Sequence, residues 1–160
     1  MICCFTGHRK ITPEHMLKLP ELLEGELEKL IVAGVCTFRG GGAVGFDTLA
    51  ELKVIEKKKK YPFIRLELIL PCRDQTKRWS ERDRTIYEYI ACEADKIEYV
   101  TDIYTPSCMH ERNRRLVEGS DYCVSYLAER SGGTAYTVNY ARSLSVEVIN
   151  LYEIIENSKL

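Results

Sequence analysis

The chain has 160 residues, of which 45% are hydrophobic and 29% are charged, and its formal net charge is −1. Length and composition are those of one globular domain, so we expect residues 1–160 to form a single domain. A nearly neutral chain lacks the overall basic field that is typical of nucleic-acid-binding proteins.

The seven cysteines argue against a disulfide framework or a metal site. Their number is odd and no pair has CxxC spacing, which is typical of small buried side chains in a reducing compartment. Those in apolar runs, Cys3, Cys4, Cys36 and Cys123, are expected to be buried. We find no signal peptide and no apolar run long enough to span a membrane. We therefore expect a cytoplasmic protein with no membrane contact, no metal and no cofactor.

Apolar runs and helical periodicities alternate along the chain. Strands are predicted, in chain order, at residues 2–5, 35–38, 66–70, 97–100, 122–127 and 146–151. Helices are predicted between them, over about residues 14–33, 46–60, 79–90, 107–118 and 135–144. This alternation predicts an α/β fold: a three-layer, Rossmann-like, doubly wound and mainly parallel sheet of about six strands flanked by helices. Such sheets bind ligands at the carboxyl ends of the strands, where the strand order reverses.

Two glycine-rich segments each join a predicted strand to a predicted helix. The first spans residues 40–47 (GGGAVGFD) and the second spans residues 131–134 (SGGT). Glycine allows a sharp turn and the close approach of a ligand, and the unpaired N–H groups of the following helical turn attract an anion. Neither segment has the GxGxxG or GK[ST] pattern of common nucleotide-binding loops. Two such turns in one chain favour a phosphate site over plain strand-to-helix connections.

Further polar residues are expected at the same edge of the sheet. Residues 6–9 (TGHR) follow the first strand and supply a hydroxyl, a backbone approach site and a cation. In the helix over residues 107–118, Asn113 lies on the apolar stripe of Met109 and Leu116. Its amide must therefore find a partner. Either it bonds to the backbone, or Asn113 and Arg112 close the pocket.

Asp83 poses the same question in the helix that contains Trp79, where a buried pair with an arginine or a place in the pocket would satisfy it. The basic groups within residues 57–60, 77–84 and 112–115 are interpreted mostly as solvated helix faces. The aromatic residues do not interleave with them along the sequence, as a base-stacking groove would require.

These motifs resemble the DprA/Smf and LOG group of SLOG domains. Residues 41–50 resemble the glycine turn GxAxGID of DprA-type DNA-processing proteins, and residues 109–112 (MHER) resemble the MHxR motif of LOG phosphoribohydrolases. Further similarities at residues 6–9, 71–72, 79, 120–121 and 131–134 make the whole chain similar to the YpsA-like branch. The resemblance implies ligands of the nucleotide class, because LOG enzymes cleave nucleoside monophosphates and DprA proteins bind single-stranded DNA.

One departure from the LOG pattern bears on activity. LOG enzymes carry PGGxGTxxE, whose glutamate is needed to cleave the N-glycosidic bond, whereas Thr137 stands at that position here. Without this carboxylate nothing obvious stabilises an oxocarbenium ion or activates water, although Asp47 and Glu111 remain as stand-ins. We therefore interpret the chain as a binding or sensing domain rather than an enzyme.

The expected partner is a nucleotide or a nucleotide-derived small molecule that carries phosphate. The expected site residues are Thr6, Gly7, His8, Arg9, Gly41, Gly42, Ala43, Gly45, Asp47, Arg112, Asn113, Ser131, Gly132, Gly133 and Thr134. The glycine turns would bind phosphate, Arg9 or Arg112 would supply the countercharge, and Thr6, His8 and Asp47 would orient ribose or base. The alternatives are a LOG-like hydrolase of nucleoside monophosphates and a DprA-like single-stranded DNA-binding module. The sequence also leaves open a homodimer through an exposed helix such as residues 107–118.

Overall fold

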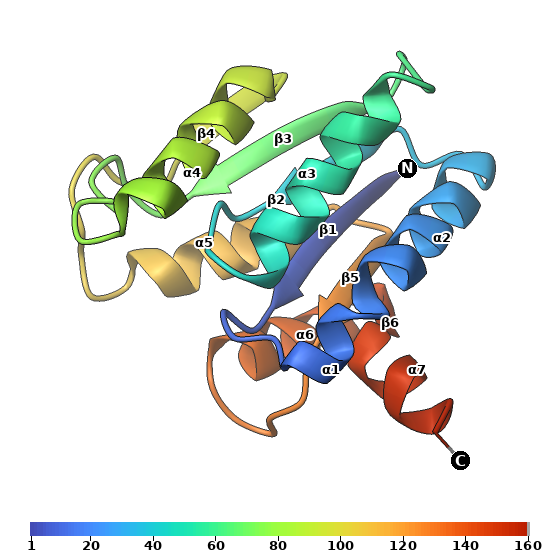
Figure 1. The fold of residues 1–160 in the computed structure, drawn as a ribbon. Helices are drawn as coiled ribbons and strands as arrows, with labels where there is room; N and C mark the ends of the chain where they lie inside the picture. The colour runs from blue at the N-terminus through green and yellow to red at the C-terminus, as the bar shows by residue number, and fades with distance from the viewer. Residues whose placement is uncertain (160) are drawn as a thin grey trace.

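The computed structural model describes residues 1–159 and contains one six-stranded sheet with helices on both faces (Figure 1). The strands are β1 (Ile2–Gly7), β2 (Thr37–Gly40), β3 (Arg65–Leu70), β4 (Lys96–Tyr99), β5 (Tyr122–Tyr126) and β6 (Glu147–Asn150). The helices are α1 (Pro13–Met16), α2 (Leu19–Val32), α3 (Phe46–Lys58), α4 (Glu81–Glu93), α5 (Cys108–Val117), α6 (Gly133–Ser143) and α7 (Leu151–Asn157). All neighbouring strands pair in parallel, in the order β4-β3-β2-β1-β5-β6. The predicted doubly wound α/β fold is confirmed.

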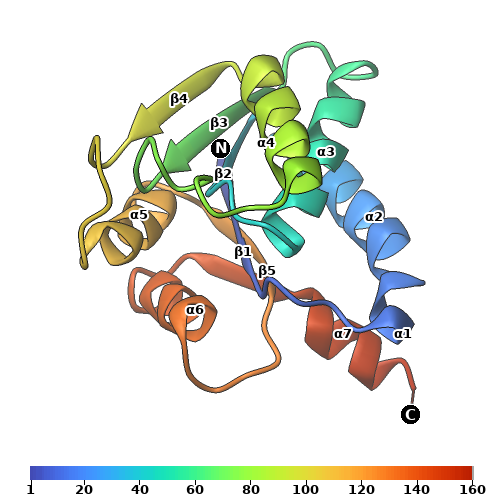
Figure 2. The same ribbon diagram turned by 60° about the vertical axis from the view of Figure 1, so that its left-hand side comes forward.

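The strand order reverses at β1. From β1 the chain adds β2, β3 and β4 on one side, and it then crosses back to place β5 and β6 on the other side. The helices α5 and α6 cover one face of the sheet, whereas α2, α3 and α7 cover the opposite face (Figures 1 and 2). The connections that leave β1 and β5 therefore run to opposite faces, which opens a crevice of the kind where such sheets bind ligands.

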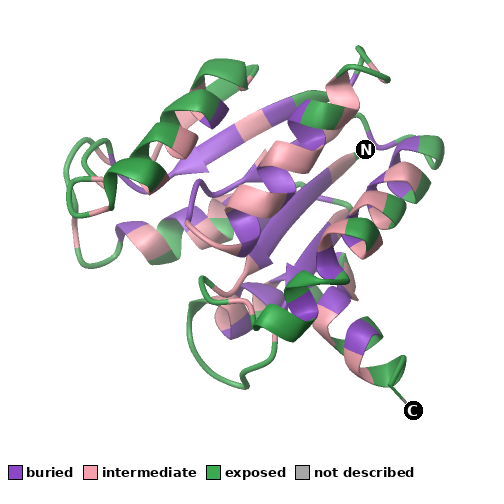
Figure 3. Cartoon of the chain, viewed as in Figure 1, coloured by how far each residue is buried: buried purple, intermediate pink, exposed green. Residues whose placement is uncertain are grey.

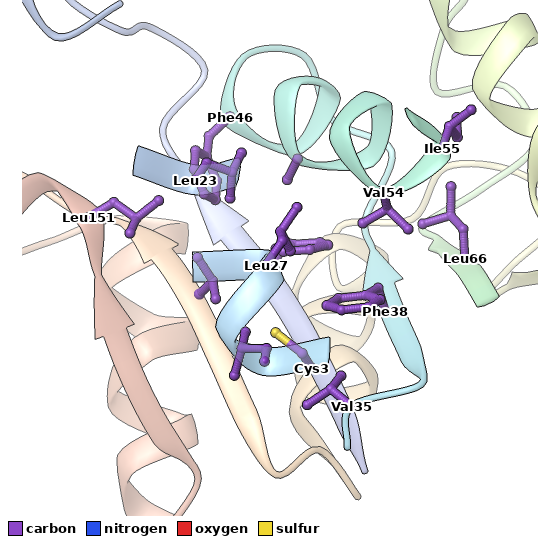
Figure 4. Packing of buried hydrophobic residues seen from close by; sticks show 14 of the residues in the cluster. Cys3, Leu23, Leu27, Val35, Phe38, Phe46, Val54, Ile55, Leu66 and Leu151 are labelled. Atoms are coloured by element: carbon purple, nitrogen blue, oxygen red, sulfur yellow. The ribbon is translucent and has the colours of Figure 1, made fainter. Parts of the chain in front are cut away.

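The largest hydrophobic core lies between the sheet and the helices α2 and α3. Figure 4 shows Leu27 of α2 and Val54 of α3 near Phe38 of β2, with Leu23 of α2 beside Phe46 of α3. A smaller cluster packs α5 and α6 against the other face. The central strands are buried on both faces (Figure 3), as expected for a parallel sheet that is covered by helices on each side. This rigid sheet fixes the positions of the loops at its carboxyl edge.

Two helices follow β1, where the sequence predicted a single helix over residues 14–33. Thr12 caps α1, because its side chain accepts a hydrogen bond from the N–H of His15. A new helix, α2, begins at Leu19 with Pro20 in its first turn. Proline has no N–H to donate to a preceding turn, and it suits the start of a helix, so the helical run is divided at this point.

The strand β2 begins two residues later than predicted. Gly34 has a φ of +105° and ends α2, and the N–H of Val35 bonds back to the carbonyl of Leu30 at 2.9 Å. This helix ending commonly packs an apolar residue just after the glycine, and Val35 is fully buried. The apolar residue therefore belongs to the end of the helix. Cys36, which was predicted to be buried, is exposed.

The start of α4 and the end of the chain also differ from the prediction. The hydroxyl of Ser80 caps α4 and accepts a hydrogen bond from the N–H of Asp83, so Trp79 precedes the helix and packs edge-on against Tyr87. Asp83 is a half-buried residue of the first turn and forms no ion pair within residues 1–159. After β6, Asn150 caps the seventh helix, α7, where the sequence predicted none.

The seven cysteines are all free. Residues 1–159 contain no group of three His, Cys, Asp or Glu side chains that could hold a metal ion. In the same part of the chain, no helix is both long enough and apolar enough to cross a membrane.

Candidate functional site

A pocket of about 310 Å³ lies at the carboxyl edge of the sheet, where the order of the strands reverses. Its walls are the loop after β1, the turn before α3, one side of α5 and the start of α6. The lining residues are Thr6, Gly7, His8, Arg9, Ala43, Asp47, Met109, Arg112, Asn113, Leu116, Gly133 and Thr134. Four segments that are far apart in the sequence therefore meet around one cavity.

Most of the residues predicted for the site line this pocket. The predicted residues that do not line it are Gly41, Gly42, Gly45, Ser131 and Gly132. Sequence reasoning missed Met109 and Leu116, which supply apolar wall. Their helical spacing was the available signal, but it was interpreted as core packing.

The first glycine turn is filled by the chain's own side chains. The N–H of Gly42 donates to Oε1 of Glu51 at 2.8 Å, so it is already paired. A Cβ atom on Gly41 would lie 2.6 Å from Nη1 of Arg112. Gly45 has a φ of +85°, and a Cβ there would overlap the backbone of the loop after β1. These glycines are required by close internal packing.

Beneath this turn lies a buried cluster of three ionisable side chains. Asp47 is 4% exposed, Glu51 is 1% exposed and Arg112 is 5% exposed. Burial raises the pKa of Asp47 to about 6, against the opposing effects of the Arg112 charge and the N–H groups of Ala43 and Gly41. Burial, and then the neighbouring Asp47, raise the pKa of Glu51 well above its ordinary value. The two carboxyl groups are therefore easier to protonate than free ones.

The guanidinium of Arg112 is tied at two of its nitrogens. Its Nη1 donates to the carbonyl of Gly41, and its Nε donates to Oδ1 of Asn113 at 2.8 Å. Within residues 1–159 no carboxylate oxygen lies within 4.0 Å of its nitrogens. The sequence left open whether Asn113 bonds to the backbone or takes part in the pocket. The structure shows that its side-chain oxygen bonds to the neighbouring Arg112 side chain and that Asn113 lines the cavity.

The second glycine turn is open and begins α6. Gly132, with a φ of +97°, precedes the helix and provides no side-chain cap, and the first turn contains no acidic residue. Residues 131–133 are exposed. A Cβ on Gly133 would lie 3.7 Å from Nδ2 of Asn113, so the amide group of Asn113 is close to the start of the helix. Unpaired N–H groups and a neighbouring amide donor at a helix N-terminus suit an anion.

His8 connects the two loops that border the pocket. Its Nε2 accepts hydrogen bonds from the N–H groups of Ala128 at 2.9 Å and Glu129 at 3.2 Å. A ring nitrogen that accepts carries no proton, so the ring is neutral and the proton is on Nδ1. Burial lowers the pKa of His8, although the charge of Glu129 opposes this. His8 thus holds the loop between β5 and α6 while lining the pocket.

Comparison with known proteins assigns this chain to a family. The sequence profile described as the YspA SLOG family matches residues 4–159. The chain belongs to the YspA SLOG family. The resemblance stated from the sequence motifs is thereby confirmed.

Two bacterial relatives match this SLOG protein over most of its length. A UPF0398 protein of Bacillus pumilus is 29% identical over 136 residues, which cover 83% of this chain and 69% of the relative. The SPbeta prophage-derived protein YoqJ of Bacillus subtilis is 30% identical over 140 residues, which cover 79% of this chain and 82% of YoqJ.

Two solved structures share the fold. DNA processing protein A of Helicobacter pylori, studied for its single-stranded DNA binding, matches 92% of this chain with a TM-score of 0.66 and 18% identity. DNA processing protein A of Streptococcus pneumoniae matches 91% with a TM-score of 0.65 and 12% identity. The SLOG chain spans 63% and 48% of those two chains, so it covers less than two thirds of either.

Thr137 occupies the position where LOG-type SLOG enzymes have the glutamate. It is fully buried in α6, and its hydroxyl donates to the carbonyl of Gly133 at 2.8 Å. The only carboxyl group that lines the pocket, within the described part of the chain, is that of Asp47. Glu111, the other stand-in, is exposed on α5 and does not line it.

Proposed function

We propose that the protein binds a phosphate-bearing nucleotide, or a small molecule derived from one, in the pocket at the carboxyl edge of the sheet. Membership of the SLOG family and likeness to DNA processing protein A support the coarse ligand class, nucleotide or nucleic acid. The finer assignment rests on the charges and hydrogen-bond donors of the pocket.

The observation that carries the proposal is the buried guanidinium of Arg112. A charge that is 95% removed from solvent normally has a partner of opposite charge in direct contact. Arg112 has none within 4.0 Å among residues 1–159, and Arg9 lines the same pocket. Burial lowers the pKa of Arg112, and the charge of Arg9 lowers it further, while Asp47 and Glu51 oppose both. A ligand anion would pair the buried cation and relieve the repulsion between the two arginines.

The start of α6 supplies the matching donors for that anion. Gly133 and Thr134 line the pocket at the first turn of the helix, where backbone N–H groups and the helix dipole favour negative charge. The rest of the ligand would lie over Thr6, His8 and Asp47. The Nδ1–H of His8 and the hydroxyl of Thr6 are donors, and the carboxyl of Asp47 can accept from a ribose hydroxyl.

The volume of the pocket limits the size of the buried part of the ligand. About 310 Å³ is at the small end of the range for ligand sites. We infer that one nucleotide or one sugar phosphate is enclosed, and that a larger ligand such as ADP-ribose extends into solvent.

Isothermal titration with AMP, ribose 5-phosphate and adenosine tests the proposal. We expect AMP and ribose 5-phosphate to bind and adenosine, which lacks phosphate, to bind at least about tenfold more weakly. Absence of any preference for the phosphorylated compounds would contradict a phosphate site.

The variant Gly133→Val tests whether the phosphate binds at the second glycine turn. Its branched side chain would crowd Asn113 and the proposed anion position, which is the space between Arg112 and the first turn of α6. AMP affinity should therefore fall at least about tenfold, while the thermal midpoint stays close to that of the wild type. The control is Gly25→Val, because a Cβ on Gly25 meets nothing within 4 Å. If Gly133→Val binds AMP with wild-type affinity, the phosphate does not bind at this turn.

A second candidate function, binding of single-stranded nucleic acid, is favoured by the seam between α5 and α6. The ring of His110 packs against Tyr136 at a tilt of 32° with centroids 3.7 Å apart, and Tyr136 stacks on Tyr140 at 6.1 Å. Arg114 lies 5.3 Å above the ring of Tyr140. Aromatic and basic side chains that do not interleave along the sequence therefore lie side by side on this seam, because two helices contribute them. Such surfaces bind single strands by stacking and charge.

Fluorescence anisotropy with a short labelled oligothymidylate separates the two candidates. A single-strand site would give salt-dependent binding that weakens in Tyr136→Leu and persists in Gly133→Val. If the oligonucleotide does not bind even at low salt, the second candidate is excluded and small-ligand binding remains as the proposed function.

A further inference from the structure

A chain of hydrogen bonds connects α3, through the first glycine turn, to Arg112 and Asn113 on α5. Oε1 of Glu51 accepts the N–H of Gly42 at 2.8 Å. The carbonyl of the adjacent Gly41 accepts from Nη1 of Arg112. The Nε of Arg112 then donates to Oδ1 of Asn113 at 2.8 Å. The links pass in turn through a helix, the first glycine turn and a second helix.

This chain determines which side of the Asn113 amide faces the anion position. A side-chain amide has one accepting oxygen and one donating nitrogen. Because Oδ1 is bonded to Arg112, Nδ2 is directed elsewhere, and it lies 3.7 Å from the Cβ position of Gly133. The donor group of Asn113 is therefore presented beside the open N–H groups of α6. The same bonds fix two nitrogens of Arg112 and leave its remaining N–H groups available.

Glu51 stands at the far end of the chain and does not line the pocket. A Cβ on Gly40 would overlap its carboxyl group, so the glycine run makes room for this side chain. Keeping a carboxyl group at 1% exposure costs folding free energy unless its contacts repay it. The neighbouring charges are Asp47 on the same helix and Arg112 on α5.

We infer that Glu51 is a positioning residue of the ligand site: its carboxyl group holds the first glycine turn, which orients Arg112 and, through it, the donor face of Asn113. The inference rests on the proposed function, because it names the groups that arrange the same anion position. This role also explains the glycines of the first turn: they make room for Glu51 and Arg112, and the N–H of Gly42 is used to hold Glu51 and is not available to the ligand.

Two substitutions at Glu51 separate the hydrogen bond from the charge. Glu51→Gln keeps an oxygen that can accept the Gly42 N–H, so AMP affinity by titration calorimetry should stay within about threefold of the wild type. Glu51→Met has a similar shape and no such acceptor, so affinity should fall about tenfold or more. The matched control is Glu56→Met, an exposed position on the same helix, which should bind as the wild type does.

The side-chain amide signals of Asn113 provide a readout that needs no ligand. In nuclear magnetic resonance spectra they should shift in Glu51→Met and stay in place in Glu51→Gln. Wild-type binding and unshifted signals in Glu51→Met would overturn the inference, as would equal loss of binding in Glu51→Gln.

A third variant keeps the test decisive if Glu51→Met does not fold. Asn113→Asp can still accept from Arg112 but presents no donor to the anion, so AMP affinity should fall about tenfold; unchanged affinity would overturn the proposed end of the chain. Failure of the wild type to bind AMP or ribose 5-phosphate would instead contradict the proposed function, while the Asn113 signals would still report on the positioning.

Discussion

At the residue scale, the main feature of the site is a group of charged side chains that are buried from solvent. Asp47 and Arg112 both line the pocket, yet they are not in direct contact. The charged groups that influence Asp47 are Arg112, Arg9 and Glu51. An anionic ligand and an ionised Asp47 would compete for the same guanidinium. Protonation of Asp47 should therefore be linked to anion binding.

This competition predicts the pH dependence of sulfate binding, because sulfate keeps its charge over the relevant range. The pKa of Asp47 is raised to about 6, chiefly by burial. Below this pH Asp47 is neutral, so sulfate affinity should rise as pH falls through about 6, by no more than about tenfold per pH unit for one linked proton. Calorimetry across this range should show the slope in the wild type and a flat, tighter profile in Asp47→Asn. The same slope in the variant would assign the linkage to another group.

The sign for stability follows from the same residue. The folded-state pKa of Asp47 lies above its ordinary value of 3.8, so the native protein binds more protons than the unfolded chain between about pH 4 and pH 6. The contribution of Asp47 to the free energy of unfolding is therefore fully present below about pH 4. It declines as the pH rises towards and through about 6, and this decline should be absent in Asp47→Asn.

At the scale of elements, the loop between β5 and α6 is attached at two places. At its base, Asn150 bonds to both the N–H and the carbonyl of Leu127 at 3.0 Å. Further along, His8 accepts from Ala128 and Glu129. Residues 128–133 are otherwise exposed. The position of the second glycine turn therefore depends on a neutral histidine from a different loop.

Removal of that histidine should loosen the loop locally. In His8→Leu the N–H groups of Ala128 and Glu129 lose their acceptor, so their hydrogen exchange should accelerate at least about tenfold. The N–H of Leu127, which bonds to Asn150, serves as the internal control and should change little. Equal acceleration at all three positions would indicate that His8 stabilises the whole domain and not the loop.

At the scale of the whole molecule, the last helix packs against the segment that follows β1 (Figure 1). His15 in α1 is buried between Glu156 of α7, at 2.6 Å, and the hydroxyl of Tyr126, at 2.9 Å. The helix α7 also buries Leu151 and Ile155 against the main core. The last helix, which the sequence pattern did not predict, therefore completes the core and holds the segment that follows β1.

Two adjacent isoleucines test this role of α7. Ile155 is 2% exposed and Ile154 is 38% exposed. Ile155→Ala removes buried methyl groups and leaves a cavity, so it should lower the free energy of unfolding by about 2–4 kcal/mol. Ile154→Ala should lower it by less than about 1 kcal/mol. Urea denaturation of both variants measures the difference; equal effects would mean that α7 does not seal the core.

The sequence by itself determined the alternation of strands and helices, the family and the four segments that surround the pocket. These follow from local signals: apolar periodicity, glycine after a strand, and polar residues where a strand ends. Two boundaries differed from the prediction, because Pro20 divides the helical run after β1, and because the apolar Val35 belongs to the helix ending at Gly34 and not to β2. The helix α7 has only seven residues, which is too short for a clear periodicity.

Only the tertiary structure decided what each glycine turn does. Both turns look alike in the sequence, but the first is occupied by Glu51 and by Arg112, and the second is open. Sequence spacing along α3 and α5 does not show that side chains from two helices meet beneath one turn. Hydrogen bonding and burial depend on the distances created by folding, so the role of a polar residue is settled by the groups that the fold places around it.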